Sequence, residues 1–167
     1  MKNIKIQKQN VGNAGEYYIA SRLSALDYTV TITLGRAEKY DILALGPKGN
    51  LIKISVKTTQ DDKAKSFTLS IKDEEGQSDD FYYAFVKLNV FKAEPDFWII
   101  PSKILCPVIK NAHKKWENTP SRDGGKHSSD NKMRRLPIEL AGGDKTYYPE
   151  TWPQELKKYY KNLEQLL

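Results

Sequence analysis

The stretch YDILALGPKGNLIKISVKTTQ, residues 40–60, combines a lone aspartate, a Gly-Pro turn and a lysine on a run that favours β-structure. Residues 40–45 and 51–59 are rich in Leu, Ile and Val, and the GPKGN segment between them supplies turn residues. Two such runs around a short turn are typical of a β-hairpin. The stretch therefore predicts two antiparallel strands at the centre of the fold.

The two sides of the second strand differ in polarity because side chains alternate along a strand. One side is apolar as far as Val56, whereas the other side carries Ser55 and Lys57. If the hairpin is symmetric about Lys48, Asp41 lies opposite Ser55, with Cβ atoms about 4.5–5.5 Å apart. Lys57 lies one pleat further, about 7 Å along the strand. An aspartate and a lysine at that separation can share one bound phosphate and one metal ion. The same register predicts two further pairs: Leu43 with Lys53, and Leu45 with Leu51.

A second unusual acidic residue lies upstream, in NAGEYYIASRLSALD, residues 13–27. Apolar residues recur there at helical spacing, which predicts an amphipathic helix with Asn13 as its N-cap. Glu16 shares a stripe with Ala20 and Leu23, on the face expected to pack against the sheet. A carboxylate there is costly to bury unless something pairs with it, and a cation shared with Asp41 would offset that cost. Alternatively, Asn13-x-x-Glu16 forms a capping box.

The remaining pattern predicts an α/β or α+β arrangement around one central sheet, with residues 1–167 as a single domain. Alternating or aromatic runs predict further strands at 28–34, 67–71, 81–90 and 96–100. Helical spacing predicts helices over 101–116, with Ser102 as cap and a kink or restart at Pro107, and over 153–167. Residues 72–80 are expected to form a solvated acidic loop. The polar segment 117–146 is expected to be a mobile insertion or lobe.

Composition narrows the class of protein further. Of the 167 residues, 39% are hydrophobic and 29% charged, the balance of a globular domain rather than a disordered chain. No apolar run is long enough for a membrane span, and we expect no membrane partner. The single cysteine, Cys106, excludes an internal disulfide framework, and without a secretory signal we expect a cytoplasmic protein. The net charge of +6 favours polyanionic partners.

The order of these features resembles a known nuclease group. GNAGEYYIASRLSALDYTV, residues 12–30, followed by YDILAL and IKISVKT, resembles the PD-(D/E)xK nuclease superfamily. In that pattern a helical Glu precedes a hairpin, which bears an Asp, then an acidic residue or Gln, one further residue, and Lys. Glu16, Asp41 and Lys57 match the pattern. Ser55 departs from it, because it stands at the position that is usually acidic.

The resemblance implies a restriction endonuclease-like fold, a central mixed sheet flanked by helices, and metal-dependent phosphodiester hydrolysis. Asp41 and Glu16 would bind Mg²⁺ (or Mn²⁺), which prefers such oxygen ligands. The Val56 backbone carbonyl would be a further ligand. Lys57 would orient the attacking water or stabilise charge on the phosphate. Ser55 offers a hydroxyl without charge, so we expect a weaker metal site than one with a third acidic residue.

Residues expected to contact nucleic acid follow Lys57 or lie in the basic segment 126–135: Thr58, Thr59, Gln60, Lys132, Arg134 and Arg135. A polar strand end explains the first group equally well, and a solvated charge run explains the second. His113 and His127 have no partner at metal-ligand spacing, so we expect both to be solvated.

Three functions remain open. The first is a Mg²⁺-dependent DNA endonuclease of restriction or repair type. The second is a catalytically impaired nucleic-acid-binding or partner subunit with the same fold, in which Ser55 has removed catalysis. The third is a structural or interaction protein. A homodimer is one expected arrangement, because many nucleases cut two strands as dimers.

Overall fold

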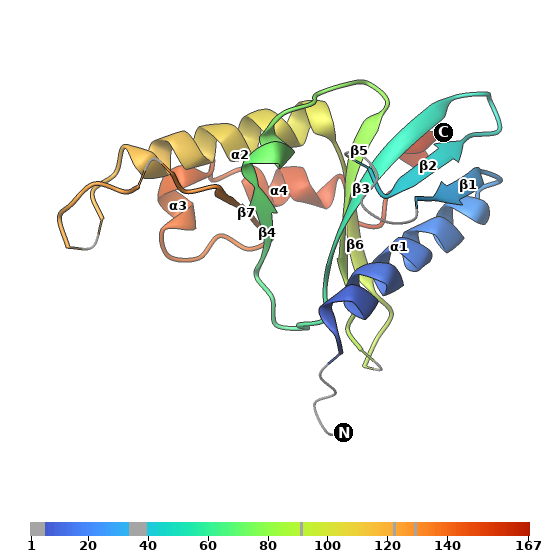
Figure 1. Ribbon diagram of the computed structural model, residues 1–167, viewed down its shortest axis with the longest axis horizontal. Helices are drawn as coiled ribbons and strands as arrows, with labels where there is room; N and C mark the ends of the chain where they lie inside the picture. The colour runs from blue at the N-terminus through green and yellow to red at the C-terminus, as the bar shows by residue number, and fades with distance from the viewer. Residues whose placement is uncertain (1–5, 34–39, 91, 122, 129) are drawn as a thin grey trace. The chain divides into compact units, whose positions relative to one another are not determined.

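A computed structural model describes residues 6–33, 40–90, 92–121, 123–128 and 130–167 of the chain (Figure 1). These residues fold into two compact units. Unit 1 combines the N-terminal segment to Ala64 with residues 80–100 and 159–167. Unit 2 combines residues 65–79 with 101–158. Whether the whole chain acts as one domain stays a prediction. No described helix is both long and apolar enough to cross a membrane.

Unit 1 is built on a five-stranded mixed sheet with the strand order β1-β2-β3-β5-β6. Its elements are α1 (Lys8–Ser24), β1 (Thr29–Ile32), β2 (Ile42–Leu45), β3 (Leu51–Thr59), β5 (Phe81–Lys87), β6 (Asp96–Pro101) and the short 3₁₀ turn η2 (Glu164–Leu166). Strand β2 pairs with β1 and β3 in antiparallel orientation, whereas β3 runs parallel to β5. The predicted class, a mixed α/β fold around a central mixed sheet, is confirmed.

Helix α1 packs against β1, β2 and β3 and buries Ile19 and Leu23 completely (Figure 1). The helix begins at Lys8 with Gln7 as its N-cap, so the prediction of Asn13 as the cap was wrong. The buried Val11 lies two turns before Ile19 on the same stripe, and its burial extends the helix toward the N-terminus. Glu16 therefore lies inside the helix, and the capping box with Asn13 does not form.

The predicted hairpin and its register are confirmed. Leu43 pairs with Lys53, and Leu45 with Leu51. The turn closes with a hydrogen bond that Gly46 N donates to Asn50 O, and Gly49 adopts φ +82°, a conformation that favours glycine. The predicted strand over 28–34 forms as β1, while its last residue, Leu34, lies outside the described residues.

One side of the sheet forms a continuous apolar core with α1. The buried members of this core are Ile19, Ala20, Leu23, Tyr28, Ile42, Ala44, Ile52, Ile54, Ala84, Val86, Phe97, Ile99, Leu163 and Leu166. Ile52 and Ile54 come from the apolar side of β3 predicted from the alternation. Because a slip of one residue would exchange the two sides of β3, this burial fixes the register that places Ser55 and Lys57.

The C-terminal helix is shorter than the one predicted over 153–167. Helix α4 (Trp152–Lys157) belongs to unit 2 and ends at Lys157. The next residues extend along β6 instead, where Ile99 N donates to Tyr159 O at 3.1 Å and Lys161 N donates to Phe97 O at 2.9 Å. Pairing with an open sheet edge satisfies the backbone and brings Leu163 and Leu166 into the core.

Unit 2 contains a two-stranded antiparallel sheet and several helices. Its elements are β4 (Ser66–Ser70), the 3₁₀ turn η1 (Ile71–Glu74), α2 (Ser102–Glu117), β7 (Met133–Pro137), α3 (Asp144–Tyr147) and α4. Helix α2 is continuous through Pro107, and Pro101, not Ser102, is its N-cap. The Ser102 hydroxyl accepts from Ser78 N at 3.1 Å and donates to Ser78 O at 3.0 Å.

A segment predicted to be a solvated loop and one predicted to be a mobile insertion both contribute to the interior of unit 2. The acidic stretch 72–80 contains Asp73, whose carboxylate accepts from Ser70 N at 2.7 Å and is buried. The segment 117–146, predicted as a mobile insertion, contains β7 and the buried Leu136. The strand pairing of β7 with β4 explains why part of this polar segment is ordered and packed.

Candidate active site

Asp41 is held at the start of β2 by its backbone and by its side chain. Its N–H donates to Ile54 O and its carbonyl accepts from Thr33 N, both at 2.9 Å. Its carboxylate Oδ2 accepts from Val56 N at 2.6 Å and from the Ser55 hydroxyl at 3.2 Å. The predicted proximity of Asp41 to Ser55 is therefore confirmed, and the carboxylate has a fixed position on β3.

Glu16 is brought toward Asp41 by the packing of α1 on the sheet. Burial raises the pKa of the Glu16 carboxyl, and the negative charge of Asp41 raises this pKa further. The charge of Asp41 therefore acts on Glu16 from a separate element, and the binding of one cation by both carboxylates stays a prediction. Like charges held together in this way are typical of sites that bind a cation or a proton.

Close contact at Gly15 permits this approach of Glu16. A Cβ atom added to Gly15 would lie 1.9 Å from Thr58 Oγ1 and 2.9 Å from Thr58 Cβ. Only a glycine allows α1 to lie this close to β3 at that point. The Gly15–Thr58 contact thus helps to position Glu16, the residue that follows Gly15 in the helix.

The other predicted site residues lie on β3 beside Asp41. Lys57 pairs with Phe85 of β5 and, by alternation, shares a side of the strand with the buried Ser55. The Val56 N–H faces Asp41, and because the N–H and C=O of one strand residue point to the same edge, its carbonyl faces that edge as well. Ser55 supplies a hydroxyl where a third acidic residue would stand. Among the described residues, no group of three or more His, Cys, Asp or Glu side chains could hold a metal ion.

The predicted nucleic-acid contacts after Lys57 lie at the end of β3. Thr58 Oγ1 is buried beneath Gly15 without a hydrogen-bond partner, Thr59 Oγ1 accepts from Asp61 N at 3.2 Å, and Gln60 Oε1 accepts from Ile6 N at 3.1 Å. Local contacts thus account for the Thr59 and Gln60 side chains. Their contacts with nucleic acid stay predictions.

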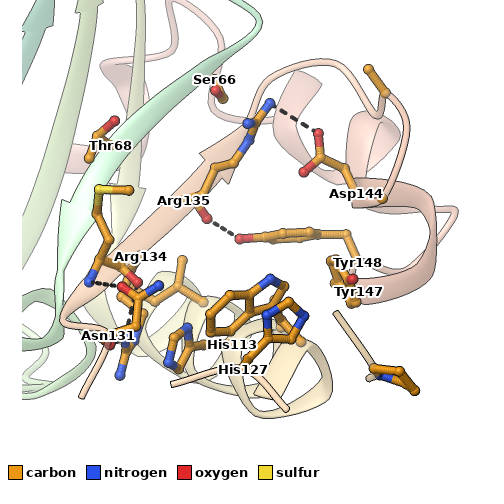
Figure 2. Close-up of a pocket in the computed structure, with 17 residues that line it drawn as sticks. Ser66, Thr68, His113, His127, Asn131, Arg134, Arg135, Asp144, Tyr147 and Tyr148 are labelled. Atoms are coloured by element: carbon orange, nitrogen blue, oxygen red, sulfur yellow. Dashed lines mark hydrogen bonds and ion pairs between the residues drawn. The ribbon is translucent and has the colours of Figure 1, made fainter. Parts of the chain in front are cut away.

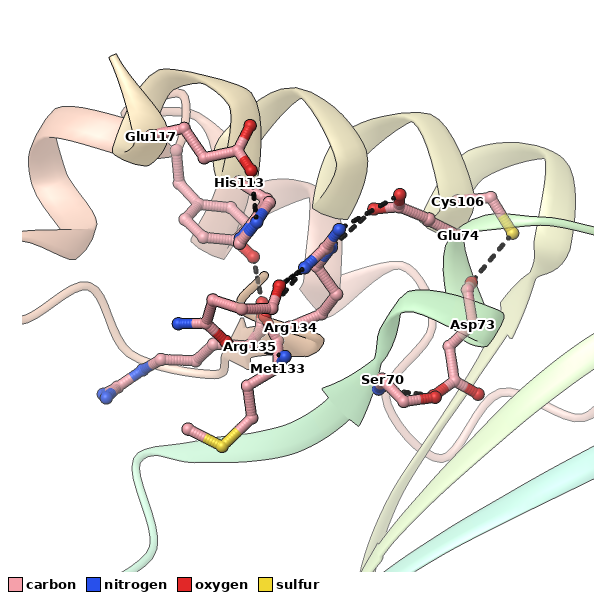
Figure 3. A network of polar contacts seen from close by, with 11 residues as sticks. Ser70, Asp73, Glu74, Cys106, His113, Glu117, Met133, Arg134 and Arg135 are labelled. Carbon is pink, nitrogen blue, oxygen red and sulfur yellow. Dashed lines mark hydrogen bonds and ion pairs between the residues drawn. The ribbon is translucent and has the colours of Figure 1, made fainter. Parts of the chain in front are cut away.

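The basic segment of unit 2 separates into a buried and an exposed arginine (Figure 3). Arg134 is 6% exposed, and its guanidinium forms a bidentate ion pair with the Glu74 carboxylate at 2.6 and 3.2 Å. This ion pair uses the charge of Arg134 inside unit 2, so the structure does not support Arg134 as a surface phosphate contact. Arg135 is exposed, with Nη2 3.3 Å from Asp144 Oδ2, and Lys132 is exposed as well.

The prediction that both histidines are solvated was wrong for His113, whereas His127 is half-buried. The His113 side chain is only 9% exposed, and its Nε2 lies 3.1 Å from Glu117 Oε1. Its ring stacks on Trp116 at 5.1 Å between centroids, and Trp116 stacks on His127 at 3.9 Å. The spacing of His113 and Trp116, three residues apart on a helix, is the signal that could have placed both on one face.

Comparisons with known proteins gave one similar solved structure and one matching sequence family. No curated protein matches this sequence. Among solved structures, a bacterial homing endonuclease, I-Ssp6803I, is similar to this chain with a TM-score of 0.48 and 15% sequence identity. The alignment covers 93% of this chain and 95% of the homing endonuclease. A sequence profile described as PD-(D/E)XK endonuclease matches residues 6–90, just over half of the chain and the part that contains Glu16, Asp41 and Lys57. The chain belongs to the PD-(D/E)XK endonuclease family.

Proposed function

We propose that this chain is a DNA endonuclease that hydrolyses phosphodiester bonds with the help of Mg²⁺ or Mn²⁺. Family membership supports the reaction class. The observation that carries the metal dependence is the approach of Glu16 to the fixed carboxylate of Asp41, whose negative charge disfavours ionisation of Glu16. A divalent cation between them would remove that repulsion, and carboxylate oxygens are the ligands that Mg²⁺ prefers.

Four groups of the chain would hold the ion: the carboxylates of Asp41 and Glu16, the Val56 carbonyl, and more weakly the Ser55 hydroxyl. A bound divalent ion lowers the pKa of a water ligand and offsets charge on the phosphate. Val56 N–H and Ser55 keep the Asp41 carboxylate in one orientation, so little reorganisation is needed when substrate arrives. Lys57, on the same side of β3 as Ser55, would orient the attacking water or stabilise charge on the phosphate.

Ser55 favours one alternative function. A site with two carboxylates instead of three binds a cation more weakly, and the chain would then act as a catalytically impaired nucleic-acid-binding or partner subunit. Both functions require the same fold and differ only in whether the metal site is occupied at cellular concentrations of Mg²⁺.

A plasmid-cleavage assay separates the two functions. Wild type, Lys57→Ala and Ser55→Glu are incubated with supercoiled DNA and Mg²⁺ or Mn²⁺. Cleavage by wild type that falls by about 10²–10³-fold in Lys57→Ala supports the endonuclease. Cleavage by Ser55→Glu alone supports the impaired subunit. DNA binding and cleavage that are absent from every variant would contradict both.

Three further properties belong to the proposal. We place the protein in the cytoplasm, supported by the lone buried thiol of Cys106. Its partner is DNA, supported by the family and by the net charge of +6. A homodimer would let two copies cut two strands, and sedimentation of the chain with and without duplex DNA tests this arrangement.

A further inference from the structure

Unit 2 contains a pocket of about 590 Å³ that is built entirely from its own residues (Figure 2). Strands β4 and β7, helix α2 and the segment around α3 all contribute to its wall. This volume lies within the range of about 300–1,000 Å³ that is usual for small-ligand sites. None of the predicted metal ligands lies here, so the pocket needs an explanation of its own.

One wall of the pocket is a stack of aromatic rings. His113, Trp116 and His127 follow one another with interplanar angles of 28° and 20°. Tyr147 and Tyr148 add two more rings to the lining. Burial and the charge of Arg134 lower the pKa of His113, so this ring is neutral near pH 7. The wall therefore offers flat ring surfaces, which suit a flat ligand.

The polar groups of the pocket include both donors and acceptors. Asn131 carries an amide, and Arg135 and Asp144 place a guanidinium beside a carboxylate at 3.3 Å (Figure 2). The Arg135 carbonyl accepts from the Tyr148 hydroxyl, which ties β7 to the segment after α3. Nucleobase edges also present donors and acceptors side by side, and Asn and Arg are side chains that pair with them.

The charged side chains that line the pocket argue against a bare anion as the ligand. The Arg134 guanidinium is neutralised by Glu74 and also donates to Asn131 O and Met133 O. Arg135 already has a carboxylate beside it. A phosphate inside the pocket would therefore meet Asp144 as well as Arg135, whereas a neutral heteroaromatic ring meets no such repulsion.

We propose that this pocket binds one unstacked nucleobase of the DNA substrate, with the ring against the aromatic wall and its edge toward Asn131, Arg135 and Asp144. The inference rests on the proposed function, because DNA is taken as the substrate. It assigns to unit 2 the recognition of a base that has left the helical stack, independently of the metal site in unit 1.

The experiment compares three labelled duplexes of otherwise identical sequence: fully paired, with one bulged nucleotide, and with an abasic residue at the bulge. Binding to the full chain is measured by fluorescence anisotropy in EDTA, so that cleavage does not interfere. A bulged base is already unstacked and costs less to extrude. We expect the bulged duplex to bind at least about fivefold more tightly than the abasic one, the lower limit for one base–aromatic stack.

Variants show whether the preference for the bulged duplex comes from this pocket. Trp116→Ala and His127→Ala should remove it, and Trp116→Phe should keep most of it. Tyr160→Ala, which removes a ring from unit 1, should leave it unchanged. His127 lies outside the helices and strands, so His127→Ala tests the pocket even if Trp116→Ala fails to fold.

Equal affinity for the bulged and abasic duplexes would overturn the inference, and so would a preference that persists in both alanine variants. The proposed function is tested separately, by plasmid cleavage. Metal-dependent plasmid cleavage without a base preference keeps the nuclease and removes the pocket's role. A base preference without cleavage by any variant keeps the pocket's role and removes the nuclease.

Discussion

Two acidic side chains, one in each unit, have opposite electrostatic environments. Glu74 in unit 2 forms a two-pronged ion pair with Arg134. Asp41 in unit 1 accepts hydrogen bonds from Val56 N and Ser55, and its charge raises the pKa of Glu16. Opposite charges are held together in the first case and like charges in the second.

This difference separates a structural ion pair from a candidate site of chemistry. The Arg134–Glu74 pair has no net charge with which to bind a ligand. Its removal would mainly lower the stability of the folded protein. The Glu16–Asp41 pair costs folding free energy in the absence of a cation, and proteins keep such arrangements where function requires them.

The largest effect is expected at Asp41. Asp41→Asn keeps the shape of the side chain and removes its charge. Loss of one electrostatic stabiliser costs about 10²–10³-fold in rate, and Asp41 also holds the ion, so we expect at least about 10³-fold slower plasmid cleavage. Asp61→Asn, an exposed carboxylate of the same unit, is the control and should cleave like wild type. Comparable cleavage by the two variants would remove the special role of Asp41.

Glu74→Gln should instead act on stability. It leaves the buried Arg134 without its counter-charge, which costs about 3 kcal/mol in the free energy of unfolding measured with urea. Glu75→Gln changes the exposed neighbour and should cost less than about 0.5 kcal/mol. A Glu74→Gln variant as stable as Glu75→Gln would mean that the ion pair has no structural role.

A matched pair of glycine variants tests the approach of Glu16. Gly15→Ala forces a Cβ atom against Thr58, whereas a Cβ at Gly12 meets nothing within 4 Å. We expect Gly15→Ala to cost about 1–3 kcal/mol of stability by overpacking. A shift of about 1 Å in Glu16 would slow cleavage by about 10²-fold. Gly12→Ala should add about 0.5–1 kcal/mol of stability and leave cleavage unchanged. If both variants cleave like wild type, the Gly15–Thr58 contact does not position Glu16.

These glycines also show what the sequence can and cannot predict. The hairpin register follows from the apolar side of β3, because a slip of one residue would bury Lys53 in place of Ile52 and Ile54. That register is enough to predict that Asp41 lies beside Ser55. The close contact at Gly15 depends on how α1 lies on the sheet, which local periodicity does not encode.

Unit 2 was the less predictable region. Arg134 and Glu74 are 60 residues apart, so nothing local in either segment indicates that they pair. In unit 1, residues 159–161 were also hard to predict: they follow a helical pattern but extend along β6, because an open sheet edge offers hydrogen bonds that outweigh helix propensity. His127 stacks on Trp116 from a polar loop, a contact that only tertiary structure reveals.

The smallest expected effect concerns pH and His113. Its pKa in the folded protein lies below the ordinary value of 6.5, because of burial and the charge of Arg134. The unfolded chain therefore binds a proton more readily, and stability is lost as pH falls through about 6.5. Thermal melts between about pH 7 and pH 5 should show a larger decrease for wild type than for His113→Phe, which keeps a stacking ring. Equal decreases would show that protonation of His113 does not affect folding.

Binding of Mn²⁺ to the protein without DNA tests the central claim most directly. Electron paramagnetic resonance titrations of wild type, Glu16→Gln and Asp41→Asn measure free Mn²⁺ independently of cleavage. If both carboxylates hold the ion, each variant should bind it at least about tenfold more weakly than wild type, with the larger loss at Asp41. Equal affinity of all three proteins for Mn²⁺, or no binding by wild type, would contradict a shared cation between Glu16 and Asp41.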